Sequence, residues 1–139
     1  MTDISPYLNR LDILNETAKQ IIKDFGLQGM EIKFSGNADN VYAELFSQIL
    51  PLIEQLQKEN FQNFYTLMYR IDISETQIKK AFKHAKDRSF SEVVTDLVLK
   101  RELQKVVTRK YFSKQDALKR NNDSPAKGSY DKNGFNSES

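Results

Sequence analysis

The chain contains no cysteine, so it can form no disulfide, no thiol nucleophile and no zinc–thiolate site. It also lacks tryptophan and has only one histidine. No apolar run approaches the length of a membrane span, and the N-terminal segment MTDISPYLNR has no apolar stretch typical of a secretion signal. We therefore expect a cytoplasmic protein that does not enter a membrane.

The residue patterns of common active sites are missing as well. The sequence has no Gly-rich phosphate loop, no G-x-S-x-G motif and no carboxylates clustered at metal-ligand spacing. His84 lies in the basic stretch KKAFKHAK, with no nucleophile or acid near it in the sequence. Because catalysis needs a convergent set of polar groups, we expect no enzymatic activity, no cofactor, no metal and no small-molecule ligand.

What the chain does have is a helical pattern over most of its 139 residues, a length that suits one domain. Apolar residues recur at spacings of three and four, which predicts an all-α domain of five helices over residues 1 to about 118. Pro51 should kink the second helix, and the third helix should be the most buried. The predicted helices span residues 6–25, 41–60, 61–71, 75–86 and 90–112.

Two of these helices begin at capping boxes. Ser74 and Gln77 form an S-x-x-Q pattern, and Ser89 and Glu92 form an S-x-x-E pattern. Ile73 and Ile78 occupy the two positions of a hydrophobic staple around the first box. These signals place helix starts at residues 75 and 90.

Two segments fall outside the helical pattern. MEIKF, residues 30–34, alternates apolar and charged residues as a strand does. A lone strand leaves both edges unpaired, so the segment is either an extended connector, which we prefer, or a strand paired with a second copy. Residues 119–139 are rich in Asn, Ser, Gly and Asp, and we predict a disordered tail there.

Charge is distributed unevenly along the chain. Residues 1–60 hold five Lys/Arg and nine Asp/Glu, net −4, whereas residues 61–120 hold fourteen and seven, net +7. A solvated lysine face explains this pattern, but a basic surface can also bind phosphates through counterion release. Weak, sequence-tolerant nucleic-acid binding is therefore an alternative function, with candidate contacts Lys79, Lys80, Lys83, Lys86, Arg88, Lys105, Arg109 and Lys110.

Four charged residues stand among apolar neighbours. They are Arg70 and Asp72 in MYRIDIS, and Arg101 and Glu102 in LKRELQK. Because buried charges need partners, we predict one polar network in which Asp72 pairs with Arg101 and Arg70 with Glu102. The structural interpretation is that the network joins helix ends, and the functional one is that it forms a contact site.

The segments SGN (35–37), LMYRIDIS (67–74) and DLVLKRELQKVVTRKYF (96–112) together resemble a family of short, uncharacterised bacterial helical proteins. The resemblance covers residues 8–112 and leaves out the tail. It implies a helical domain over those residues and no particular activity.

Broad apolar faces on residues 41–60 and 90–112 offer more hydrophobic surface than a small bundle must bury. Such a surplus is typical of a homodimer or of a protein that binds a partner. We therefore expect a non-enzymatic protein-interaction module. A monomer whose helices bury every apolar face is the remaining alternative.

Overall fold

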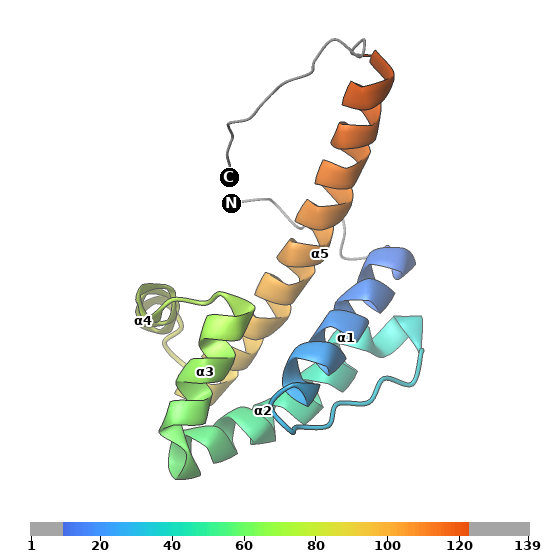
Figure 1. Cartoon of the computed structure of the whole chain (residues 1–139). Coiled ribbons are helices and arrows are strands. Elements are labelled where there is room, and N and C mark those ends of the chain that lie inside the picture. Colours follow the sequence, from blue (N-terminus) through green and yellow to red (C-terminus); the bar gives the residue numbers. More distant parts are fainter. Residues whose placement is uncertain (1–9, 123–139) are drawn as a thin grey trace. The chain divides into compact units, whose positions relative to one another are not determined.

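Five α-helices build the protein in the computed structural model, which describes the backbone of residues 10–122 and the side chains of residues 10–111 (Figure 1). A 3-10 turn, η2 (Ala38–Asn40), precedes the second helix, and residues 10–122 contain no strand. The predicted all-α fold is confirmed. The helices are α1 (Leu11–Gly26), α2 (Val41–Glu59), α3 (Phe61–Ile71), α4 (Glu75–His84) and α5 (Phe90–Asn122).

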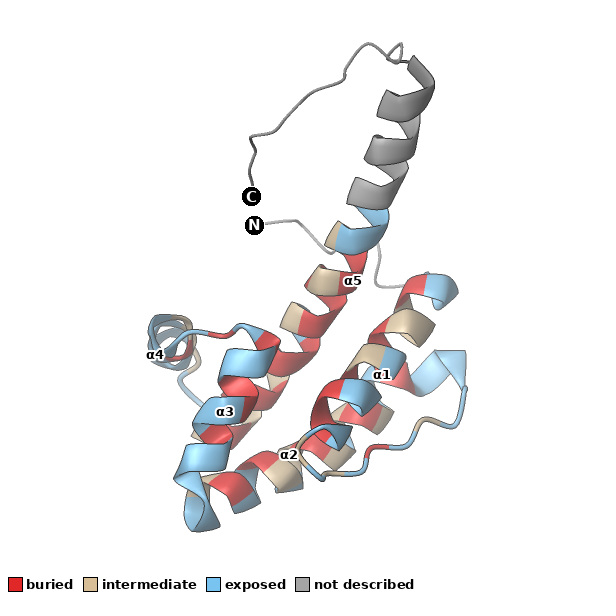
Figure 2. Cartoon of the chain, in the orientation of Figure 1, coloured by how far each residue is buried: buried red, intermediate tan, exposed pale blue. Residues whose placement is uncertain are grey.

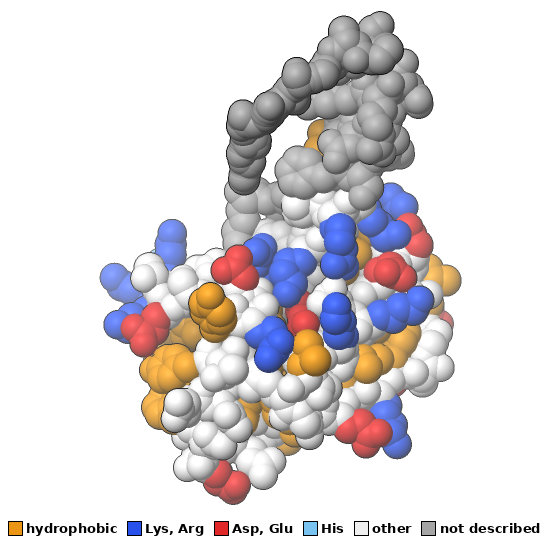
Figure 3. All heavy atoms as spheres, viewed as in Figure 1, with side chains coloured by type: hydrophobic (Ala, Val, Ile, Leu, Met, Phe, Trp, Pro, Cys, Tyr) orange, Lys and Arg blue, Asp and Glu red, His pale blue; other side chains and the backbone are white. Residues whose placement is uncertain are grey.

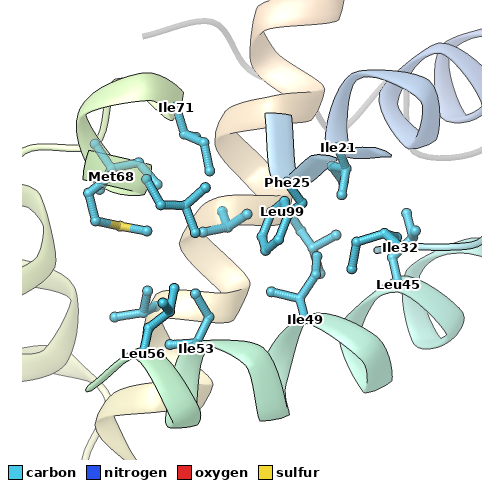
Figure 4. Packing of buried hydrophobic residues seen from close by; sticks show 14 of the residues in the cluster. Ile21, Phe25, Ile32, Leu45, Ile49, Ile53, Leu56, Met68, Ile71 and Leu99 are labelled. Atoms are coloured by element: carbon cyan, nitrogen blue, oxygen red, sulfur yellow. The ribbon is translucent and has the colours of Figure 1, made fainter. Parts of the chain in front are cut away.

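The chain divides into two compact units, residues 1–107 and 108–139, with the boundary inside α5. The hydrophobic core of the first unit takes residues from all five helices, and Figure 2 shows the buried faces in red. Phe25 of α1, Ile49 of α2 and Leu99 of α5 meet in this core (Figure 4). A smaller cluster joins α1 to α5 and consists of Ile13, Leu103, Val106 and Val107.

Residues 30–37 connect α1 to η2 without helix or strand, in agreement with the preferred interpretation of MEIKF as a connector. The Gln48 side chain accepts the backbone N–H of Lys33 (2.9 Å) and donates to its carbonyl (2.6 Å). Glu44 accepts both the backbone N–H and the hydroxyl of Ser35, each at 2.7 Å. Side chains of α2 therefore satisfy the backbone groups that a neighbouring strand would otherwise bind.

Both predicted capping boxes are confirmed. The Ser74 N–H donates to Gln77 Oε1 (2.7 Å), and the Gln77 N–H donates to Ser74 Oγ (3.1 Å). The same reciprocal bonds join Ser89 and Glu92, at 2.8 and 3.1 Å. These bonds satisfy the free backbone N–H groups at the starts of α4 and α5.

The helix bounds differ from the predictions at the two ends of the described chain, and α4 ends at His84 rather than at residue 86. α1 begins at Leu11, after Arg10 in extended conformation, whereas the expected start at residue 6 lies outside the described residues. α2 runs across Pro51 without interruption, so a kink there stays a prediction. α5 continues past residue 112 to Asn122, because no Gly or Pro interrupts residues 113–122 and most of residues 113–120 favour a helix.

Residues 119–122 of the predicted tail are therefore helical, and residues 123–139 lie outside the described part. Within residues 10–122, no helix combines the length and the apolar character that crossing a membrane requires.

Candidate functional site

Three exposed aromatic side chains form a row on α3. Phe61, Tyr65 and Tyr69 follow one another at intervals of four residues, so they lie on one face of the helix. Their exposed fractions are 51%, 47% and 88%. The rings of Phe61 and Tyr65 stack with centroids 5.1 Å apart, and Tyr69 has no ring contact within residues 10–111. We call these three residues the aromatic row.

A second stripe holds α3 in the core and consists of Phe64, Leu67, Met68 and Ile71. The expectation that this helix is the most buried is therefore wrong. Its apolar residues fall on two faces, and only one of them packs against the described chain. The other face leaves aromatic surface in contact with water.

Charges of opposite sign flank the aromatic row. Glu59, the last residue of α2, is exposed beside the start of α3 and accepts one long hydrogen bond from Gln55 (3.4 Å). Arg70, in the last turn of α3, is exposed and has no hydrogen-bond or ion-pair partner within residues 10–111. α3 itself contains no acidic residue. Figure 3 shows exposed hydrophobic side chains beside Lys and Arg side chains over the region of α3 and α4.

The predicted pair of Asp72 and Arg101 is present and anchors the end of α3 to α5. Arg101 lies 2.7 Å from Asp72 Oδ2, and its Nε donates to the Asp72 carbonyl at 3.2 Å. Asp72 ends the helix in the left-handed conformation, with φ of 70°. Because the Asp72 side chain is 79% exposed, solvent screens the charge pair. Its geometry supports the structural interpretation.

The predicted pair of Arg70 and Glu102 does not form. Glu102 is fully buried, and it belongs to a buried carboxyl cluster of Asp24, Glu102 and Lys105. Lys105 Nζ lies 2.7 Å from Glu102 Oε1 and 3.4 Å from Asp24 Oδ2. Gln20 donates to both oxygens of Asp24, at 3.1 and 3.2 Å. The predicted pair fails because the two side chains point to different places. Glu102 faces Lys105 on its own helix and Asp24 on α1, whereas Arg70 is exposed to solvent.

In the buried carboxyl cluster two carboxyl groups lie beside one ammonium group, and their pKa values move in opposite directions. Burial raises the pKa of Glu102 to about 8, and the hydrogen bond to Asp24 adds to the rise, while Lys105 opposes it. Burial also favours the neutral form of Asp24, but hydrogen bonds from Glu102 and Gln20 and the charge of Lys105 lower its pKa overall. At neutral pH the proton therefore stays on Glu102, and one carboxylate balances one ammonium.

The residues predicted to contact nucleic acid do not share one environment. Lys105 belongs to the buried carboxyl cluster, and Lys79 lies 3.9 Å from Glu75 on α4. Arg109 and Lys110 are exposed in the second unit. The remaining members of the first unit that are exposed without a partner within residues 10–111 are Lys80, Lys83 and Lys86.

Arg88 is engaged in a structural contact that joins α2 to α5. Its guanidinium lies 3.7 Å from Asp96 Oδ2 and 5.9 Å from the ring centroid of Phe46. The Tyr42 hydroxyl donates to Asp96, and Lys100 lies 2.9 Å from the same carboxylate. Binding of phosphate by Arg88 would therefore compete with an internal ion pair, unlike binding by Lys80, Lys83 or Lys86.

Sequence reasoning missed Asp24 and the aromatic row, although each left a signal. Asp24 continues the apolar spacing of Thr17 and Ile21 on α1, and a charge on an apolar stripe implies a buried partner. The row was visible as a second set of apolar residues on α3 at spacing four. In both cases the position of the residue on its helix, rather than its chemical type, was the informative property.

No protein-family model and no curated protein matches the sequence, and no solved structure matches the fold. The family resemblance of the SGN, LMYRIDIS and DLVLKRELQKVVTRKYF segments stays an expectation.

Proposed function

We propose that the protein is a non-enzymatic protein-interaction module of the cytoplasm, and that the aromatic row on α3 is its contact surface. The observation that carries the proposal is Tyr69, which is 88% exposed at the end of an aromatic stripe. Tyr and Phe are enriched in protein interfaces because they supply large apolar area, and Tyr adds a polar group at its edge.

The helix that carries the row is held firmly, which favours binding. Leu67 and Ile71 of its inner stripe are fully buried, and Asn60 caps its start by accepting the Asn63 N–H (3.2 Å). Arg101 contacts its end through the side chain and the carbonyl of Asp72. A row that is already ordered loses little conformational entropy when a partner binds.

Photo-crosslinking in an extract of the native host tests this proposal. A photoreactive benzoylphenylalanine replaces Tyr69 in one sample and Lys19, an exposed residue of α1, in the control. We expect discrete adducts from position 69, their loss when Tyr65→Ser is added, and no matching adducts from position 19. The proposal is contradicted if position 69 gives no adducts, or if its adducts persist when Tyr65→Ser is added.

Weak nucleic-acid binding remains the second candidate, and the observation that favours it is the group of exposed lysines on and after α4. Lys80, Lys83 and Lys86 could neutralise phosphates without breaking an internal ion pair within residues 10–111. Fluorescence anisotropy with labelled duplex and single-stranded DNA and RNA at two salt concentrations tests it. Binding should weaken steeply with salt and in the Lys80→Glu/Lys83→Glu variant, and no binding at low salt contradicts it.

A further inference from the structure

We propose that the partner that covers the aromatic row is a second copy of this chain, with the two α3 helices antiparallel about a two-fold axis at Tyr65. The inference rests on the proposed function and names its partner. Two properties of the surface support it, the spacing of the row and the charges at its ends, and the size of the row sets the expected strength of association.

The row is symmetric about its middle residue. Phe61 and Tyr69 stand four residues before and after Tyr65 on the same helix face. In a two-fold dimer, when residue i of one copy contacts residue j of the other, residue j of the first copy also contacts residue i of the second. Antiparallel docking therefore sets Tyr65 against its own copy and Phe61 against Tyr69 of the other copy.

The charges at the two ends of the row are complementary under the same docking. Glu59 precedes Phe61, and Arg70 follows Tyr69. Both are exposed, and neither has an ion-pair partner within residues 10–111. Antiparallel docking brings Glu59 of each copy to the end that holds Arg70 of the other, which makes two equivalent pairs. A parallel arrangement would instead place like charges together at both ends.

The size of the row predicts a weak, reversible dimer. From the exposed fractions, the three aromatic side chains offer on the order of 400 Å² per copy. If all of it is covered, both copies together bury about 800 Å², which is below the range of stable specific interfaces and matches weak, transient ones. Association should therefore depend on protein concentration, and single surface substitutions should shift it measurably.

Sedimentation velocity of the full chain over a range of concentrations up to the millimolar tests the proposal. We expect the average mass of the wild-type protein to rise toward twice the chain mass. Arg70→Glu and Glu59→Arg should each weaken the dimer by about tenfold, because each creates two like-charge contacts. An equimolar mixture of the two variants should recover the wild-type affinity, since every contact is again between opposite charges. The double variant Glu59→Arg/Arg70→Glu should recover it for the same reason.

Two further variants complete the test. Tyr69→Glu should abolish association, and because Tyr69 is 88% exposed the fold should survive, which circular dichroism checks. Lys58→Glu reverses a neighbouring charge on α2 and should not weaken the dimer. The inference is overturned if the protein is a monomer at every concentration. It is also overturned if the substitutions leave the dimer affinity unchanged, or if the mixture of Arg70→Glu and Glu59→Arg fails to recover that affinity.

Failure of this inference can be told apart from failure of the proposed function. A purified chain that stays monomeric, together with row-dependent crosslinks to another polypeptide in extract, overturns the second copy and keeps the interaction surface. The absence of any adduct that depends on Tyr65 and Tyr69 overturns both.

Discussion

Replacing Glu102 by glutamine should remove a fall in stability that the wild-type protein shows as the pH rises from about 5 to about 8. Glutamine has the shape of a protonated glutamic acid. Its amide can donate to Asp24, as the neutral acid does, and its oxygen can stay beside the Lys105 ammonium. The substitution therefore keeps the contacts of the buried carboxyl cluster and eliminates only the titration.

The magnitude follows from the pKa of Glu102, which rises from its ordinary value of 4.5 to about 8 on folding. Between these values the folded state binds more protons than the unfolded state, so stability falls as the pH rises. The contribution is fully present below the unfolded pKa and is lost as the pH passes the folded one. With about 1.4 kcal/mol per pKa unit, the free energy of unfolding should drop by roughly 3 kcal/mol between about pH 5 and about pH 8.

Urea unfolding at several pH values measures this drop through the midpoint and the slope of each transition. The wild-type midpoint should fall across the range, and the midpoint of Glu102→Gln should change little. At about pH 8 the variant should be the more stable protein by roughly 3 kcal/mol, and at about pH 5 the two should agree within about 1 kcal/mol. Asp24 does not change the direction of this pH dependence. Its pKa is lowered on folding, so its own contribution to stability changes only at lower pH.

Two controls separate this explanation from a general effect of charge. Glu54→Gln changes an exposed carboxylate on α2 and should keep the wild-type pH dependence. Asp24→Asn removes the neighbouring carboxylate, so the pKa of Glu102 should fall and the pH dependence should shrink. The reasoning is refuted if the wild-type urea midpoint stays constant between about pH 5 and about pH 8. It is also refuted if the midpoint of Glu102→Gln falls with pH as steeply as that of the wild type.

Three further predictions concern stability, and urea unfolding measures each. Asp72→Asn should cost at most about 1 kcal/mol, because the pair with Arg101 is solvent-exposed and Asn tolerates the left-handed backbone. Asp72→Val should cost more, since a β-branched residue is strained there. Ser74→Ala should cost about 1 kcal/mol by breaking the capping box, and an equal loss from Thr76→Ala, at an exposed position of the same helix, would contradict that cause. Ile49→Ala should cost about 2–5 kcal/mol because the site is fully buried, whereas Ile22→Ala, which is 37% exposed, should cost far less.

Sequence reasoning predicted the features that depend on neighbouring residues. The starts of α4 and α5 were predictable because Ser74–Gln77 and Ser89–Glu92 satisfy backbone groups within one turn. The end of α5 was not, because no strong stop signal separates Phe112 from the helix formers that follow it. Local chemistry determines where a helix begins more clearly than where it ends.

The candidate site was predictable only in part, because pairing across helices depends on the rotation of each helix. Asp72 and Arg101 could be matched by sign, and they do meet. Glu102 could not be matched in this way, since its partner Asp24 lies far away in the sequence and carries the same charge. A protonated carboxyl has no signature in composition, and it becomes apparent only when burial brings two acids together.

α4 is held to the rest of the domain by few buried side chains. Ile78 is its only buried residue, and Figure 2 shows most of the helix as exposed or intermediate. Phe82 contacts Phe90 edge to face, with ring centroids 5.7 Å apart. Segments with so few buried apolar contacts open locally at low free-energy cost while the core stays folded. Amide hydrogens of α4 should therefore exchange with solvent sooner than those of α2, and trypsin should cut first among its lysines. α4, with its exposed Lys79, Lys80 and Lys83, should therefore open before the rest of the domain unfolds.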